Sequence, residues 1–236
     1  MMGEEDMTVR TKLVRPFRFG VHEVTQSQYT EIMKNGFWKH GDWVGKTGDN
    51  VAASFVSWLD ATEFCLKLTE QERKAGYITE NQEYRLPTES EWEFACRAGT
   101  ATNYSFGADA SQLGDYAWYE GNVKRGPGAN IPETGLTSHA QETGLKKPNP
   151  FGLFDVHGNV AECCNELLRG DALPEGLDPE SYPGGFVRFR GGTWKGALKE
   201  SLSSGHIGVA EKHRRGTLGF RVLLTLPEPG KISSSE

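Results

Sequence analysis

The sequence of 236 residues contains no long apolar run, few cysteines and few histidines. Since no stretch of 18 apolar residues occurs, no membrane-spanning helix is expected. The N-terminal MMGEEDMTVRTK is polar and acidic, so the sequence predicts no signal peptide. The net charge is −6, and KHRRG at 212–216 is the one basic run. This balance argues against a nucleic-acid partner.

Four cysteines without regular spacing do not indicate a disulfide framework, and we expect a reducing, cytoplasmic compartment. Cys65 and Cys96 fall on apolar helical stripes, which predicts small buried hydrophobic side chains. Cys163 and Cys164 are adjacent. Neighbouring residues rarely point at one zinc ion, and a disulfide between them would be strained. We therefore expect one thiol to point inward and the other to point across.

Six scattered histidines include no H-x-x-x-H pair, which excludes the usual helical ligand pair. His157 lies in the stretch DVHGNVAECCNE at 155–166, and we interpret it as a structural residue. Asn159 and Glu162 of the same stretch allow two readings. Their oxygens could bind calcium together with backbone carbonyls, or they could accept hydrogen bonds from the N–H groups of their own turn.

Glycine, by contrast, is abundant at 29 residues, and aromatic side chains make up 11% of the chain. Helices are predicted to begin at Thr25, Ser57 and Thr88, each followed by an apolar face; Gln28 completes a capping box with Thr25. After residue 100 turn residues dominate, and strand-like pieces are short, as in 185–190 and 218–225. These patterns predict one α+β domain with much irregular backbone.

Several motifs then line up in the order of one family. They are PFRFGVHEVTQSQYTEIM, FVSWLDATEFCLKL, YRLPTESEWEFACRAGT, LGDYAWYEGN, KKPNPFGLFDVHGNVAECCNE, FRGGTW and LGFRV. Together they cover about residues 16 to 224. The chain resembles the formylglycine-generating-enzyme, or sulfatase-modifying-factor, domain.

This resemblance implies a C-type-lectin-like α+β fold over residues 1–224, followed by a flexible tail at 225–236. The apolar first strand of the family is missing, so an edge is either open or covered by another segment. DVHGNVAECCNE resembles the family's GNVWEWC turn. Asn159, the backbone of Val160 and Glu162 would then carry a structural calcium. Cys164 matches a common family cysteine, and Cys163 stands where the family usually has tryptophan.

The clearest departure lies between the RGG and LGFR motifs. Formylglycine generators hold copper(I) there on two cysteines about five residues apart, because this soft ion requires thiolates. The corresponding KGALKESLSSGHIGVAEKHRRGT contains no cysteine, and counting back from LGFR places the two positions near Leu198 and Ser203. No copper is therefore expected. The helical bundle and H-x-x-x-H-x-E motif of related iron enzymes are also missing.

We therefore interpret the chain as a non-catalytic module that binds a protein or peptide near its C-terminal motifs. The candidate contact residues are Trp194, Ser203, Ser204, His206, His213, Arg214 and Arg215. Arg214 and Arg215 would favour an acidic partner. Two enzymatic hypotheses remain: a formylglycine-generating oxidase, or an unknown chemistry that uses Ser203, Ser204, His206 and a carboxylate.

Overall fold

The computed structural model describes residues 15–40, 44–123, 137–169 and 184–227. Its longer helices are α1 (Gln26–Met33), α2 (Trp58–Lys74), α3 (Glu89–Arg97) and α4 (Leu113–Tyr116), and its 3₁₀ turns include η1 (Phe37–Lys39), η2 (Ala110–Gln112) and η5 (Leu198–Ser201). Its strands are β1 (Phe17–Phe19), β2 (Val44–Gly45), β3 (Tyr84–Arg85), β4 (Thr137–Ser138), β5 (Ala161–Leu168), β6 (Phe186–Arg190), β7 (His206–Ala210), β8 (Leu218–Gly219) and β9 (Leu223–Thr225). Helices and strands account for less than half of the described residues, as predicted.

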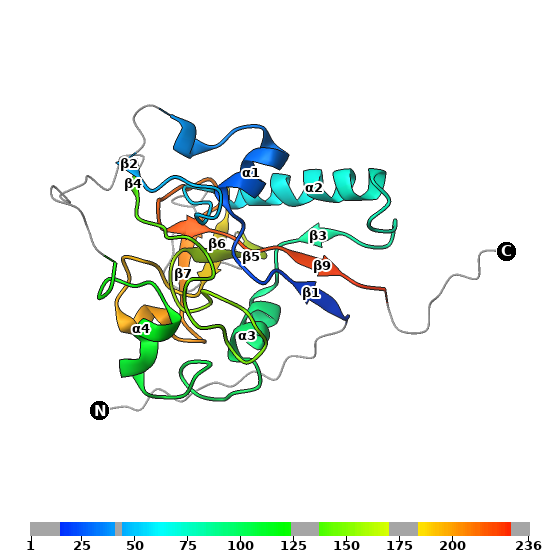
Figure 1. Ribbon diagram of the computed structural model, residues 1–236. Coiled ribbons are helices and arrows are strands. Elements are labelled where there is room, and N and C mark those ends of the chain that lie inside the picture. Colours follow the sequence, from blue (N-terminus) through cyan, green and yellow to red (C-terminus); the bar gives the residue numbers. More distant parts are fainter. Residues whose placement is uncertain (1–14, 41–43, 124–136, 170–183, 228–236) are drawn as a thin grey trace.

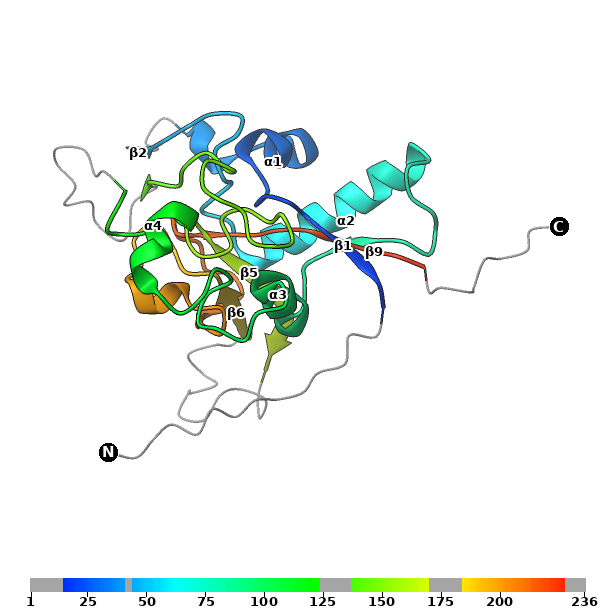
Figure 2. The same ribbon diagram turned by 60° about the horizontal axis from the view of Figure 1, so that its bottom comes forward.

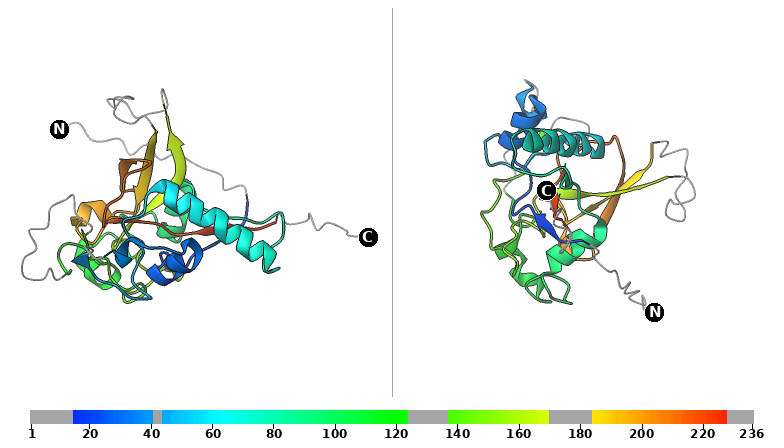
Figure 3. Two further views of the ribbon diagram at one scale, coloured as in Figure 1. Left: turned by 90° about the horizontal axis from the view of Figure 1, so that it is seen from above. Right: turned by 90° about the vertical axis from the view of Figure 1, so that its right-hand side faces the viewer.

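The strands form three small sheets, with the orders β1-β9-β3, β2-β4 and β7-β6-β5-β8. Helix α2 runs alongside the three-stranded sheet, and α3 lies beside β5 and β6 (Figures 1 and 2). Figure 3 shows β5 and β6 running together away from the body of the domain. A mixed α+β architecture is therefore confirmed. Within the described residues, no helix combines the length and apolar composition that a membrane crossing requires.

All three predicted helix starts are confirmed as capping boxes. The hydroxyls of Thr25, Ser57 and Thr88 each accept a hydrogen bond from the N–H of the third helical residue. The side chain of that residue, Gln28, Asp60 or Glu91, in turn accepts from the N–H of the cap. Each box satisfies two N–H groups that would otherwise lack partners at the start of a helix.

The main core fills the space between α1, α2 and the four-stranded sheet. Tyr29 of α1 stacks on Phe64 of α2 with ring centroids 5.8 Å apart, and Phe220 meets Phe64 edge-on at 5.1 Å. Cys163 and Phe189 of the sheet belong to the same buried cluster. A second cluster around Trp92 packs α3 on the other side of β5. The sheet therefore has a covered face toward each group of helices.

The ordered part of the domain extends beyond residue 224, where the predicted C-terminal tail at 225–236 would begin. Thr225 belongs to β9 and pairs with Phe17 of β1, and the N–H of Leu226 donates to the carbonyl of Pro16. Backbone pairing thus carries the ordered chain past the predicted boundary at 225. Residues 228–236 of that tail, and the segment before Arg15 where the family's first strand would end, lie outside the described residues.

Candidate ligand surface and the buried network beneath it

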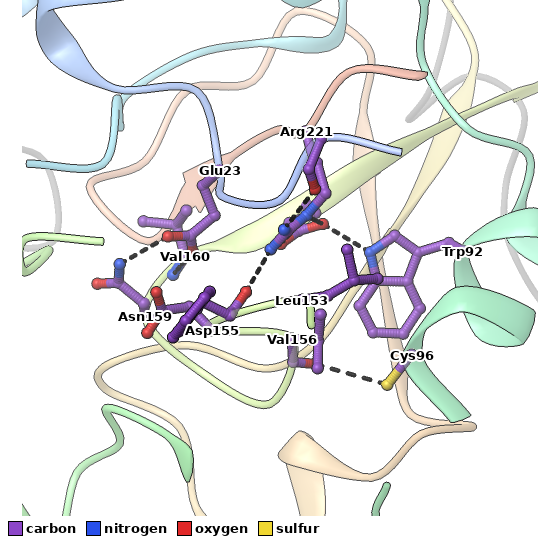
Figure 4. A network of polar contacts seen from close by, with 12 residues as sticks. Glu23, Trp92, Cys96, Leu153, Asp155, Val156, Asn159, Val160 and Arg221 are labelled. Carbon is purple, nitrogen blue, oxygen red and sulfur yellow. Dashed lines mark hydrogen bonds and ion pairs between the residues drawn. The ribbon is translucent and has the colours of Figure 1, made fainter. Parts of the chain in front are cut away.

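A buried ion pair joins Glu162 of β5 to Arg221, two residues after β8. Figure 4 shows Arg221 between Glu23 on one side and Trp92 on the other. Nη2 of Arg221 lies 2.7 Å from a Glu162 oxygen, and Trp92 donates its indole N–H to the same carboxylate at 2.7 Å. Nε of Arg221 also donates to Glu162, and the other three guanidinium N–H groups donate to the carbonyls of Gly20, Val21 and Phe154. All five guanidinium donors therefore have partners, as a fully buried charge requires.

A second carboxylate holds the turn before β5. The two oxygens of Glu23 accept from the Asn159 amide at 2.8 Å and from the Val160 N–H at 3.1 Å. Asn159 adopts φ 60, and its side-chain oxygen accepts from the N–H of Gln141. Burial raises the pKa of Glu23 well above its usual value, and nearby Asp155 adds to this effect. The turn is thus closed by side-chain hydrogen bonds.

This arrangement does not fit the predicted calcium set of Asn159, Val160 and Glu162. The Glu162 oxygens point at Arg221 and Trp92, so an added cation would have to approach a guanidinium. Asn159 directs its oxygen toward Gln141. Among the described residues, no group of three or more His, Cys, Asp or Glu side chains could hold a metal ion. Calcium at this turn stays a prediction, and it would require Glu162 to leave Arg221.

The four cysteines are all free and buried. Cys163 lies in the core cluster of α1 and α2, whereas Cys164 lies in the Trp92 cluster on the other side of β5. Burial raises the pKa of both thiols well above the usual value. The predicted burial of Cys65 and Cys96 and the opposite directions of the adjacent pair are confirmed.

His157 is a structural residue, as predicted. Its Nε2 accepts from the N–H of Ser105 at 3.1 Å, so Nδ1 carries the proton and donates to the Ser201 carbonyl at 2.8 Å. Burial lowers the pKa of His157 to about 4. The neutral ring therefore ties η5 to the turn at 104–107.

We call residues 191–217 the C-terminal segment. It leaves β6 through Gly191 and Gly192, whose φ values of 94 and 76 favour glycine. The Trp194 indole donates to the Gly216 carbonyl at 2.9 Å and so joins the two ends of the segment. Arg214 makes two bonds of 2.7 Å to Asp60 at the start of α2. The segment is therefore anchored at several points.

The structure divides the predicted contact residues into two groups. Ser204, His206, His213 and Arg215 are exposed. Three others are poor contact residues: Trp194 is 7% exposed, Ser203 is fully buried, and Arg214 is paired with Asp60. The fold already uses or encloses these side chains, so they are less available to a ligand, and their roles as ligand contacts stay predictions. The proposed grouping of Ser203 with exposed Ser204 and His206 in a catalytic site is likewise not formed.

The predicted positions of the missing copper ligands also differ in their surroundings. Leu198 in η5 is 40% exposed, whereas Ser203 is fully buried. Neither a hydrocarbon nor a hydroxyl is a soft ligand, so the pair does not fit copper(I).

Sequence reasoning missed the charged residues of the buried network, Glu23, Asp155 and Arg221. A usable signal was present for one of them, since Arg221 stands in the otherwise apolar run LGFRVLL. A charge within such a run either marks an exposed edge or is buried with a partner. Nothing in the sequence identifies that partner.

The fold and this network define the class of protein. A model of the sulfatase-modifying factor enzyme 1-like domain matches residues 1–226, and the chain belongs to this family. Treponema denticola variable protein 1 superposes with a TM-score of 0.66 at 27% identity and covers 89% of this chain and 84% of its own. CarF, at 24% identity and a TM-score of 0.65, covers 92% and 89% and shares the fold. These neighbours confirm the C-type-lectin-like fold.

Two curated relatives differ in how much they share. The chaperone protein LppX of Paenibacillus barcinonensis is 27% identical over 200 residues, 72% of this chain and 69% of its own length. The formylglycine-generating enzyme of Streptomyces coelicolor is 34% identical over 145 residues, 59% of this chain. The match spans only 40% of that enzyme.

Asp155 should make stability fall as pH rises. Burial raises its pKa to about 6, so the native state keeps a proton that the unfolded chain loses above about 4. Between pH 4 and pH 7 the wild type should lose roughly 2 kcal/mol of unfolding free energy through this group. Asp155→Asn should not show this loss. Urea unfolding at both pH values measures it. The exposed control Asp49→Asn should retain the wild-type difference, and an unchanged profile in Asp155→Asn would contradict the assignment.

His157 should act in the opposite direction. Its pKa is lowered from 6.5 to about 4, so the unfolded chain binds a proton that the native state refuses. This contribution to stability is complete above pH 6.5 and is lost as pH falls toward 4, by roughly 3 kcal/mol. At pH 7, His157→Gln should have a lower unfolding free energy than the wild type. As pH falls toward 4, its unfolding free energy should decrease by less than that of the wild type. Exposed His206→Gln serves as the control; an acid loss in His157→Gln equal to that of the wild type would refute the prediction.

Proposed function

We propose that the chain is a non-catalytic sulfatase-modifying-factor domain that binds a protein or peptide through the exposed part of its C-terminal segment. The observation that carries this proposal is the absence of thiols from residues 191–217. Copper(I) chemistry requires two soft ligands held at fixed geometry. The four cysteines of the chain lie elsewhere, buried in apolar clusters, and none is placed to replace them.

The anchoring of the segment supports a binding role. Arg190, just before the segment, pairs with Glu89 and Glu93 of α3, both at 3.1 Å, and Arg214 holds the other end against Asp60. A loop fixed by its buried and paired residues can present its exposed ones without a large ordering cost on binding. Function is commonly carried by such loops on rigid scaffolds.

The exposed charges of the segment favour an acidic ligand. Lys199, Lys212 and Arg215 of the segment are exposed, and Glu200 is an exposed carboxylate of the same segment. An excess of cations steers an anionic partner toward this surface.

The relative described as a chaperone supports protein binding, because chaperones act by binding other proteins. The free thiols support the predicted reducing compartment.

The alternative is a formylglycine-generating oxidase, favoured by the relatives that carry this name. The two functions predict different products. An oxidase converts the thiol of a substrate cysteine to an aldehyde, whereas a binding module leaves it unchanged.

We expect no aldehyde when the protein is incubated with copper(I), oxygen, a thiol reductant and a peptide carrying the sulfatase motif Cys-x-Pro-x-Arg. Mass spectrometry of the peptide measures the result, with a no-enzyme reaction as the control. The reason is that Leu198 and Ser203 supply no thiolate. Aldehyde above the control would refute the non-catalytic assignment. Copper(I) binding gained by Leu198→Cys/Ser203→Cys would support the positions inferred for the missing pair.

Lys212→Ser should weaken binding of a labelled peptide of alternating glutamate and alanine by about threefold, because one exposed charge pair contributes at most about 1 kcal/mol. Fluorescence anisotropy at low salt measures the affinity. Lys74→Ser, which removes an exposed cation from the far end of α2, is the matched control. Equal affinities of the two variants would show that the C-terminal segment does not bind this acidic peptide.

A further inference from the structure

A small hollow lies between α1 and α2, away from the C-terminal segment. Its volume is about 190 Å³. Five apolar side chains line it: Val24, Ile32, Phe64, Leu68 and Val222. Ile32 comes from α1 and Phe64 and Leu68 come from α2. Val24 lies between β1 and α1, and Val222 directly precedes β9, so the fold itself shapes the hollow.

The size of the hollow decides what can enter it. Sites for whole drug-sized ligands measure about 300–1,000 Å³, so this one accommodates a single side chain. Its apolar lining suits a hydrocarbon stem. Phe64 and Val24 are themselves buried, so their contacts with the core fix the base of the hollow.

The rim of the hollow is acidic. Glu31 stands on α1 and Glu72 on α2, accompanied by the amides of Gln28 and Gln71. Of the three cations of α2, Lys67 pairs with Glu63 at 2.7 Å and Arg73 lies 4.0 Å from Glu80, while Lys74 is exposed at the end of the helix. In the part of the chain that the structure describes, Glu31 and Glu72 belong to no ion pair. The hollow therefore combines an apolar base with two unneutralised carboxylates.

We propose that this hollow binds an arginine side chain from a basic segment of a partner protein. The methylene stem would lie on Ile32, Leu68 and Val222, as arginine stems do on apolar surfaces. The guanidinium would reach Glu31 and Glu72 on the two walls. Arginine suits this site better than lysine because its planar group offers five donors in fixed directions.

Charge complementarity argues for this partner. The whole chain carries a net charge of −6, and both ionisable residues that line the hollow are acidic. The exposed cations of the C-terminal segment would attract ligands of the opposite sign. The two surfaces therefore select different partners, and this proposal does not depend on the proposed function.

The test uses a capped five-residue peptide with a central arginine between alanines, titrated into the methyl-labelled full chain. The methyl resonances of Ile32, Leu68 and Val222 should shift. A peptide with citrulline, the neutral counterpart of arginine, should bind about fivefold more weakly, since two exposed ion pairs are lost. Raising the salt concentration should weaken the arginine peptide selectively.

Variants locate the effect on the rim. Glu31→Gln/Glu72→Gln should weaken arginine-peptide binding about fivefold. Glu70→Gln removes a charge from an exposed position of α2 outside the hollow and should leave binding unchanged. Equal binding of the arginine and citrulline peptides, equal affinity in the rim variant and in Glu70→Gln, or no methyl shifts would overturn the proposal. Lysine-peptide binding as tight as that of arginine would overturn the assignment to arginine.

Discussion

The buried pair of Glu162 and Arg221 is the interaction on which the rest of the structure depends. One guanidinium joins β5 to the carbonyls of Gly20, Val21 and Phe154, which lie as much as 201 positions from Arg221 in the sequence. Such a pair gains little over a well-packed apolar pair, yet losing one partner costs about 3–5 kcal/mol because the other charge stays buried. The network therefore specifies how these segments meet, in addition to any net stability that it supplies.

A similar division between fixed and presented residues extends to the surface. Trp194 and Arg214 hold the C-terminal segment in place through their contacts with Gly216 and Asp60. By contrast, Ser204, His206 and Arg215 face solvent. Exposed residues can change at little cost in stability, whereas a change in the anchors would release the loop. A fold of this kind can exchange one ligand for another without altering its core.

Features that depend on neighbouring residues could be predicted from the sequence, whereas contacts between residues far apart in the sequence could not. The capping boxes at Thr25, Ser57 and Thr88 follow from residues three positions apart, so the pattern contains both partners. The opposite directions of Cys163 and Cys164 follow from strand alternation. By contrast, Glu162 was read as a turn residue because its partner, Arg221, lies 59 positions away. The partners of Trp194 and Arg214 are hidden from the sequence for the same reason, since Gly216 and Asp60 meet them only in the fold.

The network also explains how this domain can exist without the family's thiolate pair. Three carboxylates, Glu23, Asp155 and Glu162, gather near one guanidinium, and burial favours protonation of Glu23 and Asp155 over full ionisation. Burial therefore disfavours ionisation of all three carboxylates together, and Arg221 neutralises Glu162. Within the described residues, the side-chain hydrogen bonds of Glu23, Glu162 and Arg221 end outside residues 191–217, and the segment meets the network at the Asn159 carbonyl, which accepts from the Trp194 N–H. On the proposed function, loss of the thiolates would therefore remove the oxidation chemistry while leaving the scaffold and its presented loop in place.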